Sequence, residues 1–371
     1  MNNNEKIIIF LAVLTVLLYF LVATPMLMDD GNQYEGFAQS LAHGKLDFKS
    51  FYGFQGLSFF AVPIFWLTKS KISIIIASAI FSLLSIPLVY LVGREYYQDK
   101  RAGLYFLILF LLTPYPYTTM MRGFQEAALL FFILLIIYAS LKKWKTTPIL
   151  WALGGIVKPF ALTLFPLFAG DFKSSKNFVW IILALVVGGM YLGASYYQTG
   201  HLINNAAIGS YEGNFDTGNP PPLWQSFAGN IKGYLRVGGN LFLSFRKIMI
   251  SPLVVLLGVI SLWHNKELKL RKEIIFAIMF NFLLVGSLTF SFSKYLLPMT
   301  TLFTLMAIPY LQKHKWLMVL VFIDSFFVFL PIWNYFGFHF WSNIYIYLIP
   351  FYLALAIYFY AIRNGNPYPN P

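Results

Sequence analysis

The chain has 371 residues, of which 58% are hydrophobic, 19% aromatic and only 11% charged. An ordinary soluble domain carries about 25% charged residues, so this composition excludes a soluble globular protein and indicates an integral membrane protein. The net charge of +13 comes largely from Lys and Arg clustered between apolar stretches, which is the positive-inside pattern and gives no reason to expect nucleic-acid binding. The chain has no cysteine, so disulfides, thiol catalysis and cysteine-ligated metals are excluded.

Apolar stretches that could cross a membrane recur along the chain. About twenty apolar residues span the hydrocarbon core at about 1.5 Å per residue. Spans are therefore expected near residues 7–27, 72–93, 102–119, 125–141, 178–197, 249–263, 273–290, 296–311, 315–333 and 342–361. The first is interpreted as an uncleaved span, because no small-residue cleavage site follows it.

Two apolar segments are ambiguous, and the basic clusters decide how they are placed. All clusters can be cytoplasmic if residues 55–67 form a short outer-side helix that does not cross. Residues 148–169 must then form two half-length helices that meet near Lys158-Pro159. A break there is expected, because proline removes a backbone donor and disfavours helix at the preceding residue.

This topology predicts an all-α polytopic protein of the cell membrane. Residues 1–371 form a single membrane domain with about twelve helical segments and both termini in the cytoplasm. Residues 29–71 become an outer catalytic loop with short helices. Residues 198–247 become a long outer loop, rich in Gly, Asn and Pro at its centre, that could meet an acceptor.

Charged and polar side chains gather on the outer face in this topology. Carboxylates suit a general base or a metal ligand, and Lys and Arg suit a phosphate or pyrophosphate group. A lysine inside an apolar segment is costly and tends to face a cavity, which favours a site role for Lys158. The pattern predicts a membrane enzyme that acts on a phosphorylated lipid. The candidate site residues are Asp29, Asp30, Tyr34, Arg122, Glu126, Lys158, Lys294 and Tyr295.

The first-loop candidates have structural alternatives. Asp30 could cap a helix over residues 33–42, and Asp29 has a weaker claim to the site than Asp30. Glu35, one turn beyond Asp30, is expected on the solvated face of that helix. Tyr34 could belong to the interfacial aromatic belt.

The later candidates have alternatives as well. Arg122 and Glu126 lie four residues apart at a helix start and could form only an intrahelical ion pair. Lys294 could extend to the lipid headgroups instead of reaching a substrate.

Three motifs resemble those of a known family. The run Asp30-x-x-x-Tyr34-x-x-x-Ala38-x-x-Leu41-x-x-Gly44 resembles the first-loop signature of GT-C glycosyltransferases, as found in protein O-mannosyltransferases and lipid A aminoarabinose transferases. Lys158-Pro159 is similar to the Lys-containing break of the family. Lys294-Tyr295-Leu296-Leu297-Pro298 is similar to its Arg/His-Tyr-Leu-Leu-Pro run. These motifs follow the order of the family through residues 1–310.

The resemblance implies a GT-C fold and an inverting transfer. Asp30, by its position in the signature, would deprotonate the acceptor hydroxyl, which displaces a polyprenyl phosphate from the sugar. Cationic side chains or a divalent metal would stabilise the departing charge, with Asp30 and Glu126 as the candidate metal ligands. Gly31 stands where many relatives have a second carboxylate, so the metal question stays open and no cofactor is assigned. The outer soluble domain of larger relatives is not seen in this sequence.

We therefore expect a membrane glycosyltransferase that moves a hexosyl or pentosyl group from a polyprenyl-phosphate donor to a glycan, lipid or protein acceptor on the outer face. The alternative is a polytopic flippase or transporter of lipid-linked sugars, because transporters also use broken helices and buried charges. Transporters commonly show repeated halves with matching interruptions, which this sequence does not show. A polymerase or ligase of surface glycans would share the donor chemistry.

Overall fold

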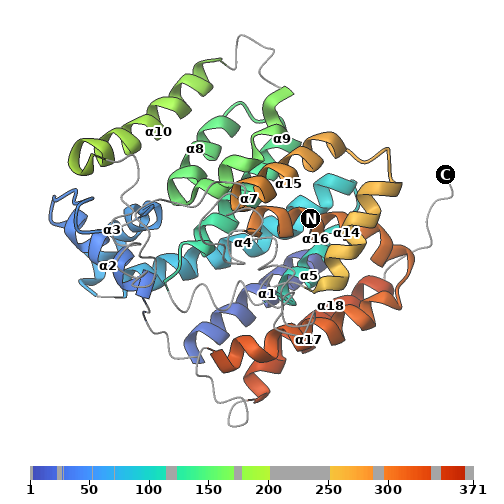
Figure 1. The fold of residues 1–371 in the computed structure, drawn as a ribbon. Helices are drawn as coiled ribbons and strands as arrows, with labels where there is room; N and C mark the ends of the chain where they lie inside the picture. The colour runs from blue at the N-terminus through green and yellow to red at the C-terminus, as the bar shows by residue number, and fades with distance from the viewer. Residues whose placement is uncertain are drawn as a thin grey trace, which may run out of the picture.

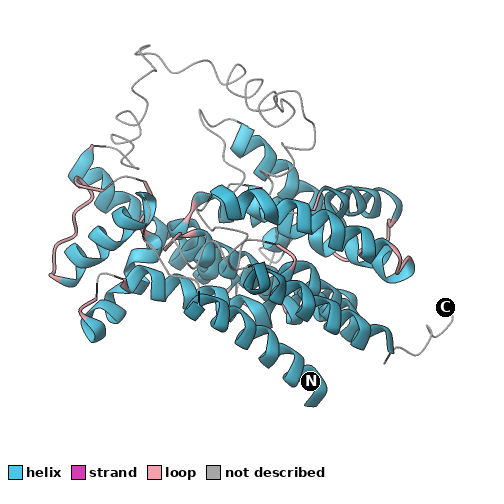
Figure 2. Ribbon diagram, turned by 90° about the horizontal axis from the view of Figure 1, so that it is seen from below, coloured by secondary structure: helices cyan, strands magenta, loops and turns pink. Residues whose placement is uncertain are grey.

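The computed structural model describes residues 3–22, 27, 29–51, 53–70, 72–113, 123–170, 178–200, 251–286, 296–335 and 344–363. These residues form helices and short connections, and no strand occurs among them (Figures 1 and 2). The predicted all-α fold class is confirmed for this part of the chain.

The first 141 residues of the chain supply six described α-helices. They are α1 (Asn3–Val22), α2 (Asp29–Ala42), α3 (Gly56–Thr68), α4 (Ser73–Tyr97), α5 (Lys100–Leu111) and α7 (Glu126–Leu141). The short helix expected at residues 55–67 is present as α3. The helix expected to begin at residue 102 is present as α5, which ends at Leu111.

The remaining helices complete a layered bundle. They are α8 (Thr147–Val157), the 3-10 helix η1 (Pro159–Leu164), α9 (Pro166–Ala169), α10 (Phe178–Thr199), α14 (Pro252–His264), α15 (Arg271–Gly286), α16 (Leu297–Lys313), α17 (Leu317–Tyr335) and α18 (Ile344–Arg363). Within the described residues, Ser73–Tyr97 and Phe178–Thr199 are long and apolar enough to cross a membrane, judged by length and composition.

The predicted break at Lys158-Pro159 is confirmed, but the second half differs from the prediction. Helix α8 ends at Val157, and Lys158 is extended, with φ −155° and ψ 138°. The chain then continues as the six-residue 3-10 helix η1 and the single turn of α9, not as one half-length α-helix. Pro159 and Pro166 each open a new segment, where a missing backbone N–H is tolerated.

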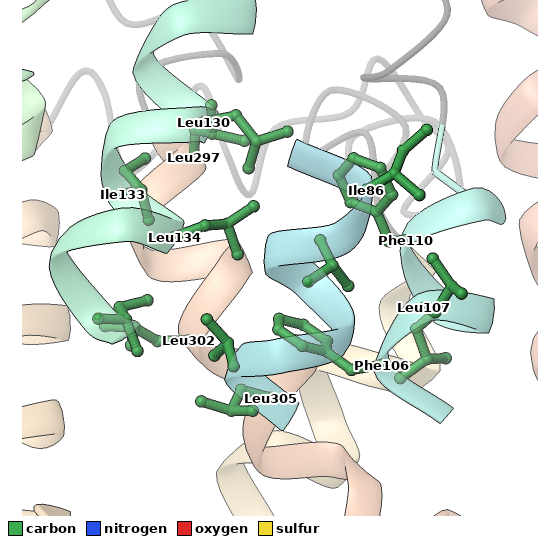
Figure 3. Close-up of a cluster of buried hydrophobic side chains, with 14 of the residues drawn as sticks. Ile86, Phe106, Leu107, Phe110, Leu130, Ile133, Leu134, Leu297, Leu302 and Leu305 are labelled. Atoms are coloured by element: carbon green, nitrogen blue, oxygen red, sulfur yellow. The ribbon is translucent and has the colours of Figure 1, made fainter. Parts of the chain in front are cut away.

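The core lies where α4, α5, α7 and α16 meet. Figure 3 shows their buried side chains side by side, including Ile86 of α4, Phe106 of α5, Leu134 of α7 and Leu305 of α16. Lipid tails are as apolar as these side chains, so close packing rather than exclusion from water holds such helices together in a membrane. A cavity of about 30 Å³ remains between α5, α7 and α16, which is room for about one or two water molecules.

Glycine allows α4 and α5 to approach closely. A Cβ atom at Gly103 of α5 would lie 2.7 Å from the carbonyl oxygen of Tyr90 of α4. A Cβ atom at Gly93 of α4 would lie 2.8 Å from the carbonyl oxygen of Ala102. Small residues at these crossings bring the backbones together and set the position of α4, on whose first turn the candidate site is built.

Candidate functional site

Helix α2 carries the predicted catalytic base. It begins at Asp29, so Asp30 is its second residue and lies within the first turn, not before the helix as a cap would. A carboxylate in the first turn interacts favourably with the positive end of the helix dipole. Asp30 is half-buried. Helices α2 and α3 lie side by side next to the beginning of α4 (Figure 1).

Glu35 does not lie on a solvated face, and that prediction is wrong. Only 3% of the residue is exposed. Its carboxylate accepts hydrogen bonds from Ser73 Oγ at 2.9 Å and from the backbone N–H of Ile74 at 2.8 Å, both in the first turn of α4. Gln39 Nε2, one turn along α2, donates a further bond at 3.1 Å. The residue points into the protein because the first N–H groups of a helix need acceptors, and a carboxylate suits the dipole there.

Tyr34 is a core residue rather than a member of an exposed aromatic belt. It is 7% exposed and packs in the main hydrophobic cluster. Its backbone carbonyl accepts a hydrogen bond from Ser58 Oγ of α3 at 2.8 Å. Tyr34 therefore helps to fix α2 against α3.

Glu126 and Lys158 form a buried ion pair. Glu126 is the first residue of α7 and Lys158 is the extended residue at the α8–η1 break, so the break turns the lysine toward α7. Their side chains are 1% and 9% exposed, and Lys158 Nζ donates to Glu126 Oε1. The structure thus places the acid of the predicted Arg122–Glu126 pair beside a lysine 32 positions further along the chain.

The start of α3 links these parts, a role that the sequence did not reveal. Gln125 Nε2 donates to the Phe54 carbonyl, and the Gln55 backbone N–H donates to the Tyr191 hydroxyl of α10 at 2.8 Å. Gln55 and Gln125 are both completely buried. The only hint in the sequence was two glutamines at the edges of apolar helices, because their partners lie far away along the chain.

A close backbone contact joins α3 to the α8–η1 break. A Cβ atom at Gly56 would lie 2.4 Å from Val157 Cα and 2.6 Å from the Ile156 carbonyl oxygen. Only glycine lets the first turn of α3 rest on the residues immediately before Lys158. The position of Lys158 is therefore tied to that of α3, which also holds α2.

The connection between α2 and α3 is held by α10. Gln198 Oε1 accepts from the Phe48 backbone N–H at 2.8 Å, and Gln198 Nε2 donates to the Leu46 carbonyl. Within this connection Asp47 accepts hydrogen bonds from Ser50, which hold the pKa of the Asp47 carboxyl below its usual value even though partial burial opposes this. The segment is thus ordered by its own hydrogen bonds.

Several predicted site residues lie outside the described residues. Arg122, Lys294 and Tyr295 are among them, as is nearly all of the loop expected at 198–247, and the side chain of Asp29 is likewise not described. Their roles stay predictions.

Asp30 and Glu126, the two candidate metal ligands, are both among the described residues. Among the described residues, no three His, Cys, Asp or Glu side chains lie close enough to hold a metal ion together. Glu126, one of the two candidate ligands, already has the Lys158 ammonium beside it, and a cation at that carboxylate would compete with it. The described residues do not make up a metal site, and no chemical step below is routed through one.

The arrangement combines a half-buried acid with a buried, neutralised ion pair. The acid is suited to accept a proton, and the lysine carries the positive charge that a phosphate needs. The acid lies on α2 and the lysine at the α8–η1 break. Helix α3 contacts both of these elements and the first turns of α4.

The chain is similar in part of its sequence and in its fold to proteins that are already known. Residues 59–187 match the family described as dolichyl-phosphate-mannose-protein mannosyltransferase. Among solved structures, the chain is similar to ArnT from Cupriavidus metallidurans in the apo state, with a TM-score of 0.57 and 12% identity. It is also similar to ArnT from the same organism bound to undecaprenyl phosphate, with a TM-score of 0.59 and 13% identity. Each likeness covers 95% of this chain and 74% of ArnT. No curated protein matches the chain in sequence.

These findings confirm the resemblance and the fold. The chain shares the all-helical fold of ArnT over 95% of its length. The matched family segment contains Glu126 and Lys158 but neither Asp30 nor Lys294.

Proposed function

We propose that the protein is an integral membrane glycosyltransferase that transfers a sugar from a polyprenyl-phosphate donor to an acceptor at the outer face of the cell membrane. The observation that carries this proposal is the Glu126–Lys158 pair. Both residues fall within residues 59–187, the part that matches the mannosyltransferase family, and they form a buried contact in a fold shared with ArnT. A charged pair is expensive to bury in a membrane protein unless it serves a site.

Asp30 is the general base of the proposed reaction. Its carboxylate takes the proton of the acceptor hydroxyl, and the oxygen attacks the anomeric carbon of the sugar from the side opposite the phosphate. A new glycosidic bond forms as the carbon–oxygen bond to the polyprenyl phosphate breaks, so the configuration at that carbon inverts. Phosphate leaves with the bonding electrons and needs no general acid.

Among the residues that the structure describes, Lys158 is the cation that we propose to contact the leaving phosphate. In the absence of donor its charge is balanced by Glu126, so the lysine can stay buried without an uncompensated charge. A donor phosphate would share the ammonium with Glu126 as negative charge develops on the leaving oxygen. Arg122, Lys294, Tyr295 and Asp29 are proposed to complete the substrate contacts.

The donor class rests on the comparison with ArnT. The similar structure holds undecaprenyl phosphate, which supports a polyprenyl phosphate as the lipid of the donor. The acceptor is a glycan, a lipid or a protein hydroxyl. Transfer at the outer face, with both termini in the cytoplasm, follows from the basic clusters.

The experiment begins by finding the sugar. Mass spectrometry of lipid-linked sugars and surface glycans, with and without the gene, identifies the donor that accumulates and the product that disappears. Transfer is then measured with purified membranes and that donor. Asp30→Asn should lower the transfer rate about 10²–10⁴-fold at unchanged expression, which is the range that a general base contributes.

Asp47→Asn is the matched control. It lies on the connection between α2 and α3, belongs to no predicted site, and should transfer at the wild-type rate. Wild-type transfer by Asp30→Asn would overturn the assignment of the base. Movement of the lipid-linked sugar across proteoliposomes with no transfer to any acceptor would instead favour the flippase alternative.

A further inference from the structure

Glu35, on the short helix α2, contacts the first turn of α4. The residue before α4, Ile72, offers no side-chain cap to that helix. The missing acceptor comes from another helix, because Glu35 of α2 binds both Ser73 Oγ and the Ile74 N–H. Glu35 is 3% exposed, and its carboxylate also accepts a hydrogen bond from Gln39 of α2. A charge at this depth is retained because the end of α4 satisfies it.

The contact fixes how α2 is turned about its own axis. Glu35 lies five residues after Asp30, which places the two side chains about 140° apart around the helix and about 7.5 Å apart along it. Tyr34 and Phe37 are buried and hold α2 near α3 through apolar contacts, and the Tyr34 carbonyl also accepts a hydrogen bond from Ser58 Oγ of α3. The hydrogen bonds that the Glu35 carboxylate accepts from the first turn of α4 are directional as well, and they tie α2 to a second helix, so together these contacts select one rotation of α2.

A small rotation would matter for a catalytic carboxylate. Side-chain atoms lie about 5 Å from a helix axis, so a turn of about 20° moves the carboxylate of Asp30 by nearly 2 Å. A displacement of about 1 Å can lower a reaction rate about 100-fold. Loss of the contact between Glu35 and α4 could therefore lower the reaction rate by displacing Asp30, although Glu35 itself lies away from the reacting atoms.

We propose that Glu35 is a positioning residue: its bond to the first turn of α4 sets the rotation of α2 and so the placement of Asp30. The inference rests on the proposed function in that Asp30 is taken as the base. The structural half of the inference, that Glu35 places residue 30, stands independently of any reaction.

The structural half is tested by labelling. Because the chain has no cysteine, Asp30→Cys creates a single thiol in an otherwise wild-type protein. Its rate of reaction with a water-soluble maleimide is measured alone and combined with Glu35→Ala, Glu35→Gln or Ser73→Ala. We expect at least about a fivefold change with Glu35→Ala, because loss of the contact releases the first turns of α2. Smaller changes are expected with the two milder variants, which each keep part of it.

Asp324→Ala is the matched control, because Asp324 makes the same kind of contact elsewhere. It lies on α17 and binds Ser251 Oγ and the Leu253 N–H at the start of α14. It should weaken the fold as Glu35→Ala does but leave the labelling rate at position 30 unchanged. If Glu35→Ala does not yield folded protein, Glu35→Gln and Ser73→Ala decide the question. Unchanged labelling in all the Glu35 and Ser73 variants would overturn the proposal.

The catalytic half is tested by kinetics. In the protein with Asp30 intact, Glu35→Ala should lower kcat about 100-fold with the KM for the donor unchanged, Glu35→Gln should recover much of the loss, and Asp324→Ala should keep the wild-type kcat. If the Glu35 variants change the labelling rate but the wild type transfers no sugar, the proposed function is wrong and the role of Glu35 in placing residue 30 stands. Transfer that needs Asp30 but is indifferent to Glu35 would remove this inference alone.

Discussion

The Glu126–Lys158 pair should respond unequally to the loss of its two members. Glu126 is 1% exposed and carries its charge on a short stem at the first turn of α7. Lys158 is 9% exposed, and its long stem can redirect the ammonium toward water or headgroups. Removing one partner of a buried pair typically costs about 3–5 kcal/mol. Lys158→Met should therefore cost about 3–5 kcal/mol of unfolding free energy, and Glu126→Gln about 1–3 kcal/mol.

Replacing both partners should restore stability. In Lys158→Met/Glu126→Leu no charge is left to bury, and such replacements are commonly neutral or stabilising. The free energy of unfolding of the double variant should lie within about 1 kcal/mol of the wild-type value, a smaller loss than the sum of the losses in Lys158→Met and in the matching single variant Glu126→Leu. If Lys158 also contacts the donor phosphate, the same variant should be folded but should not transfer sugar, which separates the structural part of the pair from its role in the reaction.

The measurement is denaturant unfolding in detergent micelles, followed by tryptophan fluorescence. The Lys142–Glu95 pair is the control, because its nitrogen and oxygen lie 2.5 Å apart but the lysine side chain is 37% exposed. Lys142→Met should cost less than about 1 kcal/mol, as expected for a pair near water. Equal losses for Lys158→Met and Lys142→Met, or strictly additive losses in the double variant, would refute the argument from burial.

Two further predictions concern how α3 is held. Gly56→Ala should destabilise the protein by about 1–3 kcal/mol or more, because its Cβ would lie 2.4 Å from Val157 Cα. Gly188 of α10 has open space around it, so Gly188→Ala should leave the free energy of unfolding unchanged or raise it slightly. Equal effects of Gly56→Ala and Gly188→Ala would contradict the packing argument. Tyr191→Phe removes the hydroxyl oxygen that accepts the Gln55 N–H and should lower the free energy of unfolding by about 1–3 kcal/mol. An unfolding midpoint equal to that of the wild type would contradict this prediction.

The helices and their main interruption were predictable because their causes are local. Hydropathy and length locate α4 and α10, which the structure places within a few residues of the expected spans. Proline explains the break at Lys158-Pro159 through its own geometry. The 3-10 form of η1 was not predicted, since its sequence is as apolar as an ordinary helix.

The site could be predicted in part. The sequence singles out Lys158 because a lysine in an apolar stretch is costly and tends to face a cavity, and the structure pairs it with Glu126. The partner was not predicted, because Arg122 is four residues from Glu126 whereas Lys158 is 32 residues away. Gln55 and Gln125 were not included in the predicted site, since nothing in a single sequence indicates which buried amide will meet which carbonyl.

The sequence by itself determined the class of protein, its helices and the kinds of chemical group available, because apolar length, proline and charge act where they stand. Only the tertiary structure decided where the charges are satisfied. Glu35, expected in solvent, is buried because the first turn of α4 needs an acceptor. Lys158 faces Glu126 because Gly56 lets α3 settle against the residues just before it. Those contacts join residues 32 and 39 positions apart and depend on how the helices pack.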